Sequence, residues 1–207
     1  MSARDAFAAD FDVPRGTLAK FDIYTEMLID WQSRMNLVGP STLPTLWERH
    51  FADSAQLVAL SPEDGDWIDI GAGAGFPGIV VALLSDHPVA LVDSVAKKCR
   101  FMQAVIDALG LASQVIVRNA RVEALPARPY AIVSARACAS LPQIFGWGLR
   151  VADRSTQWLL LKGETVAQEI ESAREEYAFD VELVASRTDP RGHIVVARDV
   201  RRKARRR

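Results

Sequence analysis

The chain has 207 residues, of which 49% are hydrophobic and 25% charged, which is enough to bury one substantial core. Its two cysteines, Cys99 and Cys138, exclude a disulfide framework, and no apolar run approaches the roughly 20 residues of a membrane span. The amino terminus has no secretory hydrophobic segment. We therefore expect a cytoplasmic protein with neither a membrane segment nor a metal site.

The formal charge of −1 conceals an uneven distribution. Residues 198–207 hold seven of the 25 basic side chains and one acidic one, so the first 197 residues carry 18 basic and 25 acidic groups, a formal charge of −7. A cationic terminus on an acidic body indicates a polyanionic partner reached mainly through that terminus, or else a solvated tail that only aids solubility.

The first 62 residues predict a helical extension. From Leu18, apolar residues recur at intervals of three and four up to Val38, which predicts one helix with a buried stripe that ends at Gly39-Pro40. A second helix is predicted over Leu43–Leu60, capped by Ser41 or Thr42.

Residues 63–197 predict an α/β domain, and residues 198–207 a basic tail. Short apolar runs, which are typical of parallel strands buried on both faces, alternate with helical segments. Around the turn Asp189-Pro190-Arg191-Gly192, Val181–Val184 and Ile194–Ala197 predict an antiparallel edge hairpin. The remaining strands are predicted at 67–70, 89–92, 115–117, 131–133 and 158–161, and the helices at 77–84, 95–109, 140–150 and 165–176.

The glycine-dense stretch from Asp69 to Gly78 follows the first strand and precedes a helix. Glycines are needed where a strand turns sharply and a ligand touches bare main chain, because a Cβ would block both. Gly73 to Gly78 satisfies G-x-G-x-x-G, so a nicotinamide or flavin dinucleotide is one alternative. The longer pattern, an acidic residue followed by alternating Gly71, Gly73 and Gly75, favours S-adenosylmethionine, and so does the edge hairpin. The predicted fold is therefore a Rossmann-like class I methyltransferase with a seven-stranded, mostly parallel sheet.

Two further positions are candidates for cofactor contacts. Asp93 ends the second strand, 22 residues after Gly71, where a carboxylate can accept hydrogen bonds from ribose hydroxyls; alternatively, Asp93 or Ser94 caps the next helix. Val122-Glu123 follows the third strand, where a loop would face the adenine, although Glu123 fits a solvated loop equally well.

Several blocks in order resemble the RsmG, or GidB, family of small-subunit rRNA guanine-N7 methyltransferases. The resemblance extends from about Trp31 to Ala197, and its most specific parts are the glycine block with Phe76-Pro77-Gly78 and the block Arg49-His50-Phe51-Ala52-Asp53-Ser54. The other blocks that carry it are Asn36-Leu37-Val38, Leu91-Val92-Asp93-Ser94, Lys97-Lys98-Cys99-Arg100-Phe101, Arg121-Val122-Glu123, Ala135-Arg136-Ala137 and Leu161-Lys162-Gly163.

The resemblance implies that S-adenosylmethionine binds to the main chain of Gly71, the side chain of Phe76 and Arg136, with Val122 and Glu123 along the adenine. It also implies that the partner is 16S rRNA or the small ribosomal subunit rather than DNA. Family members often have a serine directly before the arginine, whereas here Ala135 precedes Arg136 and Ser134 is displaced by one.

Guanine N7 carries a lone pair and no proton, so its methylation needs alignment rather than a catalytic base. No Asp/Asn-Pro-Pro-aromatic signature for amine methylation follows the fourth strand, and Cys138 is interpreted as a small buried thiol rather than a nucleophile.

Candidates near the acceptor are His50, Asp53, Arg136 and Lys162. Arg49 and Asp53 are spaced as an i,i+4 ion pair, and Lys162 ends the fifth strand, where a phosphate of the target nucleotide would lie. Two other functions remain open: a cofactor-sensing RNA-binding protein that transfers nothing, and a nicotinamide oxidoreductase, for which no hydride-transfer constellation is found.

Overall fold

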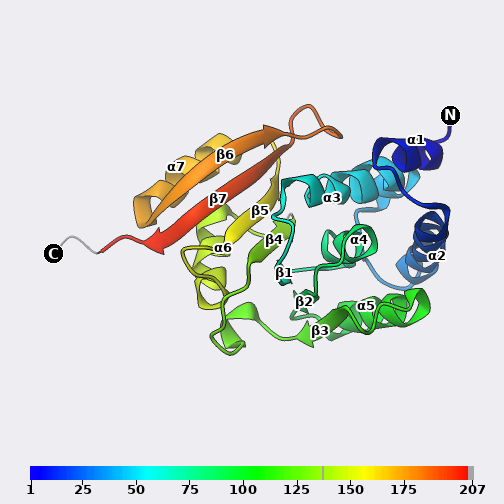
Figure 1. The fold of residues 1–207 in the computed structure, drawn as a ribbon, viewed down its shortest axis with the longest axis horizontal. Helices are drawn as coiled ribbons and strands as arrows, with labels where there is room; N and C mark the ends of the chain where they lie inside the picture. The colour runs from blue at the N-terminus through cyan, green and yellow to red at the C-terminus, as the bar shows by residue number, and fades with distance from the viewer. Residues whose placement is uncertain (137, 205–207) are drawn as a thin grey trace.

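The computed structural model describes residues 1–136 and 138–204, and it consists of one seven-stranded sheet with helices on both faces (Figure 1). The strand order is β3, β2, β1, β4, β5, β7, β6, in which β7 runs antiparallel to both of its neighbours and the other pairs are parallel. The fold class predicted from the sequence is confirmed. The strands are β1 (Trp67–Ile70), β2 (Val89–Asp93), β3 (Val115–Asn119), β4 (Ile132–Arg136), β5 (Gln157–Lys162), β6 (Tyr177–Ala185) and β7 (His193–Arg202).

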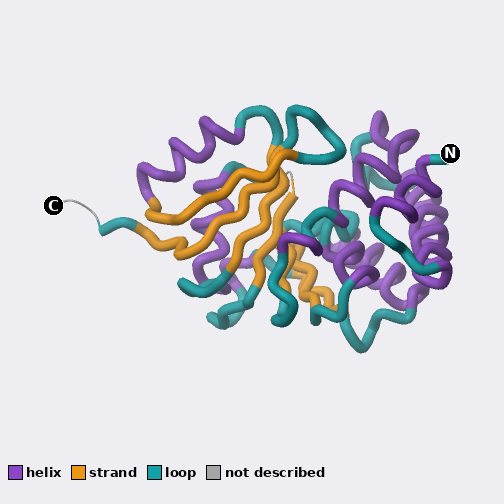
Figure 2. The backbone as a smooth tube through the Cα atoms, turned by 45° about the horizontal axis from the view of Figure 1, so that its top comes forward, coloured by secondary structure: helices purple, strands orange, loops and turns teal. Residues whose placement is uncertain are grey.

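The two faces of the sheet bury separate apolar clusters. One cluster joins the sheet to the amino-terminal helices and to α4 and α5, and the other joins it to α6 and α7. In Figure 2 the helices accordingly lie on either side of the strands. The helices are α1 (Ala3–Asp10), α2 (Arg15–Gln32), α3 (Asp53–Ala55), α4 (Gly78–Leu84), α5 (Ala96–Leu109), α6 (Leu141–Gly148) and α7 (Val166–Glu176), with short helical turns η1 (Pro40–Thr45), η2 (Trp47–Ala52), η3 (Val58–Leu60), η4 (Val122–Ala124) and η5 (Leu149–Val151).

The amino-terminal extension differs from its prediction. The long helix ends at Gln32 rather than near Gly39, because the Gln32 side chain satisfies the following loop: Oε1 accepts from the amides of Leu37 and Val38 at 2.9 and 3.0 Å. The single helix predicted over Leu43–Leu60 is wrong. That stretch is a 3-10 turn, a widened π turn, one α turn and another 3-10 turn, and Pro44 in its first part has no amide to continue a helix.

The prediction of a basic tail over residues 198–207 is also partly corrected. Strand β7 continues to Arg202 and pairs with β6 along its length, so Arg198, Arg201 and Arg202 belong to the sheet rather than to a tail. The last three arginines of the predicted tail, residues 205–207, lie outside the described residues. In the ranges that the structure describes, no helix is both long and apolar enough to cross a membrane.

Candidate functional site

A cavity of about 850 Å³ opens where β1, β4 and β5 end. Its walls come from the glycine-dense turn after β1, from the residues that end or follow β4 and β5, from η2 with the start of α3, and from the loop between β6 and β7. In open α/β sheets this carboxyl edge is where ligands bind. The cavity lining includes Gly71, Gly73, Phe76, His50, Asp53, Arg136, Cys138, Lys162 and Ser186.

The turn after β1 presents main chain to the cavity. Gly73 has a φ of +62°, and a Cβ built there meets only the Gly71 carbonyl oxygen, at 3.7 Å, so a side chain would extend into the space where a ligand fits. The Gly73 amide donates to Asp93 Oδ2 at 3.0 Å, and Asp93 Oδ1 accepts from the Val95 amide at 2.8 Å. Asp93 thus fixes the turn. The N-cap residue of α5 is Val95 rather than Asp93 or Ser94, although Asp93 holds the amide of that residue.

Asp69 supports the same turn from beneath. It is fully buried and absent from the cavity wall; Oδ2 accepts from the Gly78 amide at 3.0 Å, and Oδ1 accepts from Ser134 Oγ at 2.8 Å. Trp67 Nε1 in turn donates to Ser134 Oγ at 2.7 Å. Burial raises the pKa of Asp69 to about 7. The Ser134 hydroxyl, two residues before Arg136, is therefore committed to hydrogen bonds with Asp69 and Trp67 inside the sheet.

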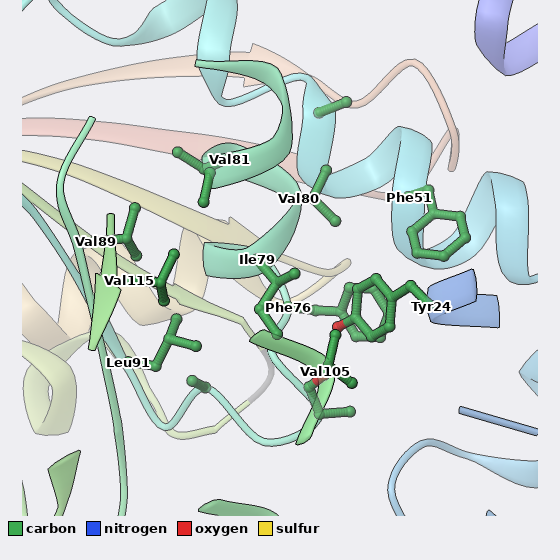
Figure 3. Packing of buried hydrophobic residues seen from close by; sticks show 14 of the residues in the cluster. Tyr24, Phe51, Phe76, Ile79, Val80, Val81, Val89, Leu91, Val105 and Val115 are labelled. Atoms are coloured by element: carbon green, nitrogen blue, oxygen red, sulfur yellow. The ribbon is translucent and has the colours of Figure 1, made fainter. Parts of the chain in front are cut away.

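The amino-terminal extension packs directly on the glycine-dense turn (Figure 3). Phe76 stacks on Tyr24 of α2, with ring centroids 5.3 Å apart at 17°, and on His50 of η2, at 5.0 Å and 30°. The Tyr24 hydroxyl donates to the Ala74 carbonyl at 2.5 Å. This role of Tyr24 could not be predicted from the sequence, because its spacing in α2 fits an ordinary buried stripe.

His50 lies in the cavity wall as a neutral imidazole. Its Nε2 is 2.7 Å from Thr42 Oγ1, and burial, with the positive charges of Arg136 and Arg49, lowers its pKa to about 3. Arg136 places its guanidinium 4.9 Å from the centre of the Phe76 ring and donates to the Arg49 carbonyl at 3.1 Å. Burial lowers the pKa of Arg136, and the carboxylate of Asp53 acts in the opposite direction.

Asp53 and Arg49 bind the loop between β6 and β7 instead of each other. Asp53 Oδ1 accepts from Thr188 Oγ1 at 2.8 Å, and Arg49 forms an ion pair with Asp189 at 2.7 Å. The alternative of an ordinary i,i+4 surface pair is therefore not what the structure shows, because partners from a loop more than 130 residues away occupy both side chains, and Arg49, His50 and Asp53 all line the cavity. Burial raises the pKa of Asp53, against the effect of Thr188 and the two arginines.

Lys162 reaches the cavity wall, but its charge is already paired. The ammonium is 2.8 Å from Glu169 of α7 and donates to the Ala139 carbonyl at 2.5 Å, and the side chain is 5% exposed. Lys162 therefore links β5 to α7, and the phosphate contact predicted for it stays a prediction. A buried pair of this kind is costly to break from one side.

Cys138 is exposed as a residue, which corrects the sequence interpretation of its position, whereas its Sγ is partly buried and donates to the Ile70 carbonyl at 3.6 Å. Desolvation and the charge of Asp69 raise the pKa of its thiol to about 11, so the neutral thiol predominates and the group is a poor nucleophile.

The predicted adenine contacts lie apart from the cavity wall. Val122 is buried in the cluster with α6 and α7, and Glu123 is exposed on η4.

Comparison with known proteins identifies the family. The model of the family GidB, rRNA small subunit methyltransferase G, matches residues 17–195. A protein of Rhizorhabdus wittichii named ribosomal RNA small subunit methyltransferase G is 41% identical over 191 residues, which cover 91% of this chain and 88% of that protein. One of the same name from Rhodospirillum rubrum is 40% identical over 200 residues, 96% of this chain and 98% of that protein. This chain belongs to the GidB family.

A solved structure with the same fold is a putative S-adenosyl-L-methionine-dependent methyltransferase from Methanococcus maripaludis, with a TM-score of 0.59 over 74% of this chain and 86% of that one at 11% identity. In the GidB-family chain described here, the structure brings together the predicted Gly71, Gly73, Phe76, Arg136, His50, Asp53 and Lys162 around one cavity. It adds residues of the loop between β6 and β7, which sequence reasoning recognised only as a turn.

Proposed function

We propose that this protein transfers the methyl group of S-adenosylmethionine to N7 of a guanine in 16S rRNA of the small ribosomal subunit. The observation that carries the proposal is membership of the GidB family together with a main-chain cradle at the carboxyl edge of the sheet. Nothing favours the two other functions, a sensor that binds without transferring and a nicotinamide oxidoreductase.

The residues present fit S-adenosylmethionine. The open space beside Gly73 accepts a ligand against bare main chain, and Asp93 holds that turn in place. We assign the cofactor to Gly71, Gly73, Phe76 and Arg136, with Gly75, Asp69 and Asp93 shaping the turn beneath them. Val122 and Glu123 remain candidates for the adenine. When bound, the cofactor supplies an electrophilic methyl group on a sulfonium.

The side chains around the cavity supply alignment rather than proton transfer. Guanine N7 is already nucleophilic, and the pKa of about 3 leaves His50 neutral at physiological pH. The pKa of about 11 keeps Cys138 a thiol, and the Lys162 ammonium is paired with Glu169. The task of these residues is to hold the acceptor in line with the methyl group, the main contribution an enzyme makes to such a displacement.

Contacts to the rRNA backbone are assigned to basic side chains around the cavity mouth. Lys98 lines the cavity, and Lys97 and Arg100 are exposed on the same helix, α5. Neutralising fewer phosphates lowers the salt dependence of RNA binding. Substituting these three residues with glutamine should therefore weaken RNA binding and flatten its salt dependence, without changing cofactor affinity.

The test is to map N7-methylguanine by chemical strand scission in small-subunit RNA from cells with and without this protein. The proposal expects one scission site that disappears with the gene and returns when purified protein and S-adenosylmethionine are added to RNA or subunits from the deletion strain. An unchanged scission pattern, with cofactor binding intact, would leave a protein that binds without transferring.

A further inference from the structure

The Asp53 carboxylate is held in place through one oxygen, while its other oxygen keeps free acceptor capacity among the described residues. Oδ1 accepts from Thr188 Oγ1 at 2.8 Å and, more weakly, from Ser186 Oγ and Gln56 Nε2 at 3.5 Å. Among the described residues, Oδ2 receives no hydrogen bond. A carboxylate has about four acceptor positions, so this side chain lines the cavity with an oxygen ready for an external donor.

The position of Asp53 in the cavity suits the far edge of the acceptor base. The glycine-dense turn forms one part of the cavity wall, and Asp53 with Ser186 and Asp189 forms another. If the methyl donor lies on the turn, N7 of the purine must face it. The opposite edge of a guanine carries two donors, N1–H and the N2 amino group, and enzymes that act on an extruded base commonly read this edge by hydrogen bonds.

We propose that Asp53 is the specificity-determining residue that recognises guanine, accepting hydrogen bonds from N1–H and the N2 amino group. This inference rests on the proposed function, because it assumes N7 methyl transfer in the same cavity. Adenine would present an acceptor at N1 and no N2 amino group, which would leave a partly buried carboxylate without a partner. An enzyme can reject a wrong substrate effectively when that substrate leaves a polar group of the binding site without a hydrogen-bond partner.

The loop between β6 and β7 acts as the positioning element. Besides Thr188, the loop is anchored through the Arg187 amide, which donates to Gln56 Oε1 at 2.7 Å, and through the ion pair of Arg49 with Asp189. Thr188 holds Oδ1 of Asp53, so the carboxylate plane is set before the base enters. Preorganised groups of this kind give more discrimination than mobile ones.

The experiment compares guanosine with inosine, which keeps N1–H and N7 but lacks the N2 amino group. After the methylated position has been located, splinted ligation places either nucleotide there in small-subunit RNA. Methyl transfer is then followed in single turnovers with wild type, Asp53→Asn and the matched control Asp189→Asn. The control loosens the same loop but leaves the Asp53 carboxylate unchanged.

A hydrogen bond to a charged group corresponds to a preference of roughly 10- to 100-fold. We expect the wild type to favour guanosine over inosine by about that factor, Asp53→Asn to lower the ratio to about one, and Asp189→Asn to slow both substrates equally. Where turnover of a variant is too slow to follow, the same ratio is measured as binding of the two RNAs in the presence of S-adenosylhomocysteine.

Two results would overturn the inference. One is a wild-type ratio near one, and the other is an Asp53→Asn variant that keeps the wild-type ratio. Either would leave the proposed function standing, since methyl transfer to guanosine would still be seen. Absence of transfer from wild type to the guanosine RNA would instead refute the proposed function itself.

Discussion

Replacing His50 by glutamine should change how the stability of the protein depends on pH. His50 is 6% exposed and lies against the Phe76 ring, and its pKa is lowered from 6.5 to about 3. As the pH falls below 6.5, the unfolded chain takes up a proton on this imidazole while the native protein does not. The stabilisation associated with the neutral imidazole is therefore complete above pH 6.5 and is lost progressively as the pH falls towards 3.

The magnitude follows from the distance between the working pH and 6.5. At about pH 5 the difference is about 1.5 pH units, and at about 1.36 kcal/mol per unit the wild type loses about 2 kcal/mol that the glutamine variant does not lose. Asp69 acts in the opposite direction, because its raised pKa of about 7 favours the native state at low pH. That contribution is common to both chains and cancels in their difference.

The assay is urea denaturation of both proteins at several pH values between about 5 and 7.5, with free energies of unfolding from linear extrapolation. The free energy of unfolding of the wild type, relative to that of the variant, should decrease by about 2 kcal/mol from the upper to the lower pH. Phe51→Leu is the control: it disturbs the adjacent core position without a titratable group, so its cost should not vary with pH. A His50→Gln difference that is equally constant would refute the assignment of a buried neutral imidazole.

Three other substitutions test how the site is built. Gly75→Ala should lower stability by about 1–3 kcal/mol and abolish S-adenosylhomocysteine binding in calorimetry, because φ is +91° and the new Cβ would lie 2.4 Å from Ile79 Cδ1; Gly16→Ala, which meets no atom within 4 Å, should instead stabilise by about 0.5 kcal/mol. Tyr24→Phe removes the hydroxyl that holds the turn. The loss of a hydrogen bond worth about 1 kcal/mol should lower the affinity for S-adenosylhomocysteine by about fivefold; unchanged affinity would contradict this role. Lys162→Met leaves the Glu169 carboxylate without its partner and should cost about 3–5 kcal/mol in chemical denaturation, and adding Glu169→Gln should recover part of the loss; a cost below about 1 kcal/mol would show that the pair is not effectively buried.

The sequence alone determined the sheet and the cofactor turn. Strands that are buried on both faces have continuous apolar runs in the sequence. Glycines occupy positions 71, 73 and 75 because each of these residues has a positive φ, which other residue types rarely adopt. These are properties of neighbouring residues, so they are legible in the order of amino acids. The same restriction to neighbouring residues explains the errors. Hydrophobic periodicity led to a single predicted helix through Pro44, and the run of basic residues led to Arg201 being assigned to a tail rather than to strand β7.

Only the tertiary structure decided which side chains meet at the cavity. The hydrogen bond between Asp53 and Thr188 joins residues 135 positions apart in the chain, and the one between Tyr24 and Ala74 joins residues 50 positions apart. Residue spacing offered an Asp53–Arg49 pair as one alternative and could not indicate a protein partner for Lys162. In the folded chain Asp53 is paired with a loop 135 residues away, and Lys162 is paired with Glu169 in the next helix, because a buried charged group needs a partner beside it in space.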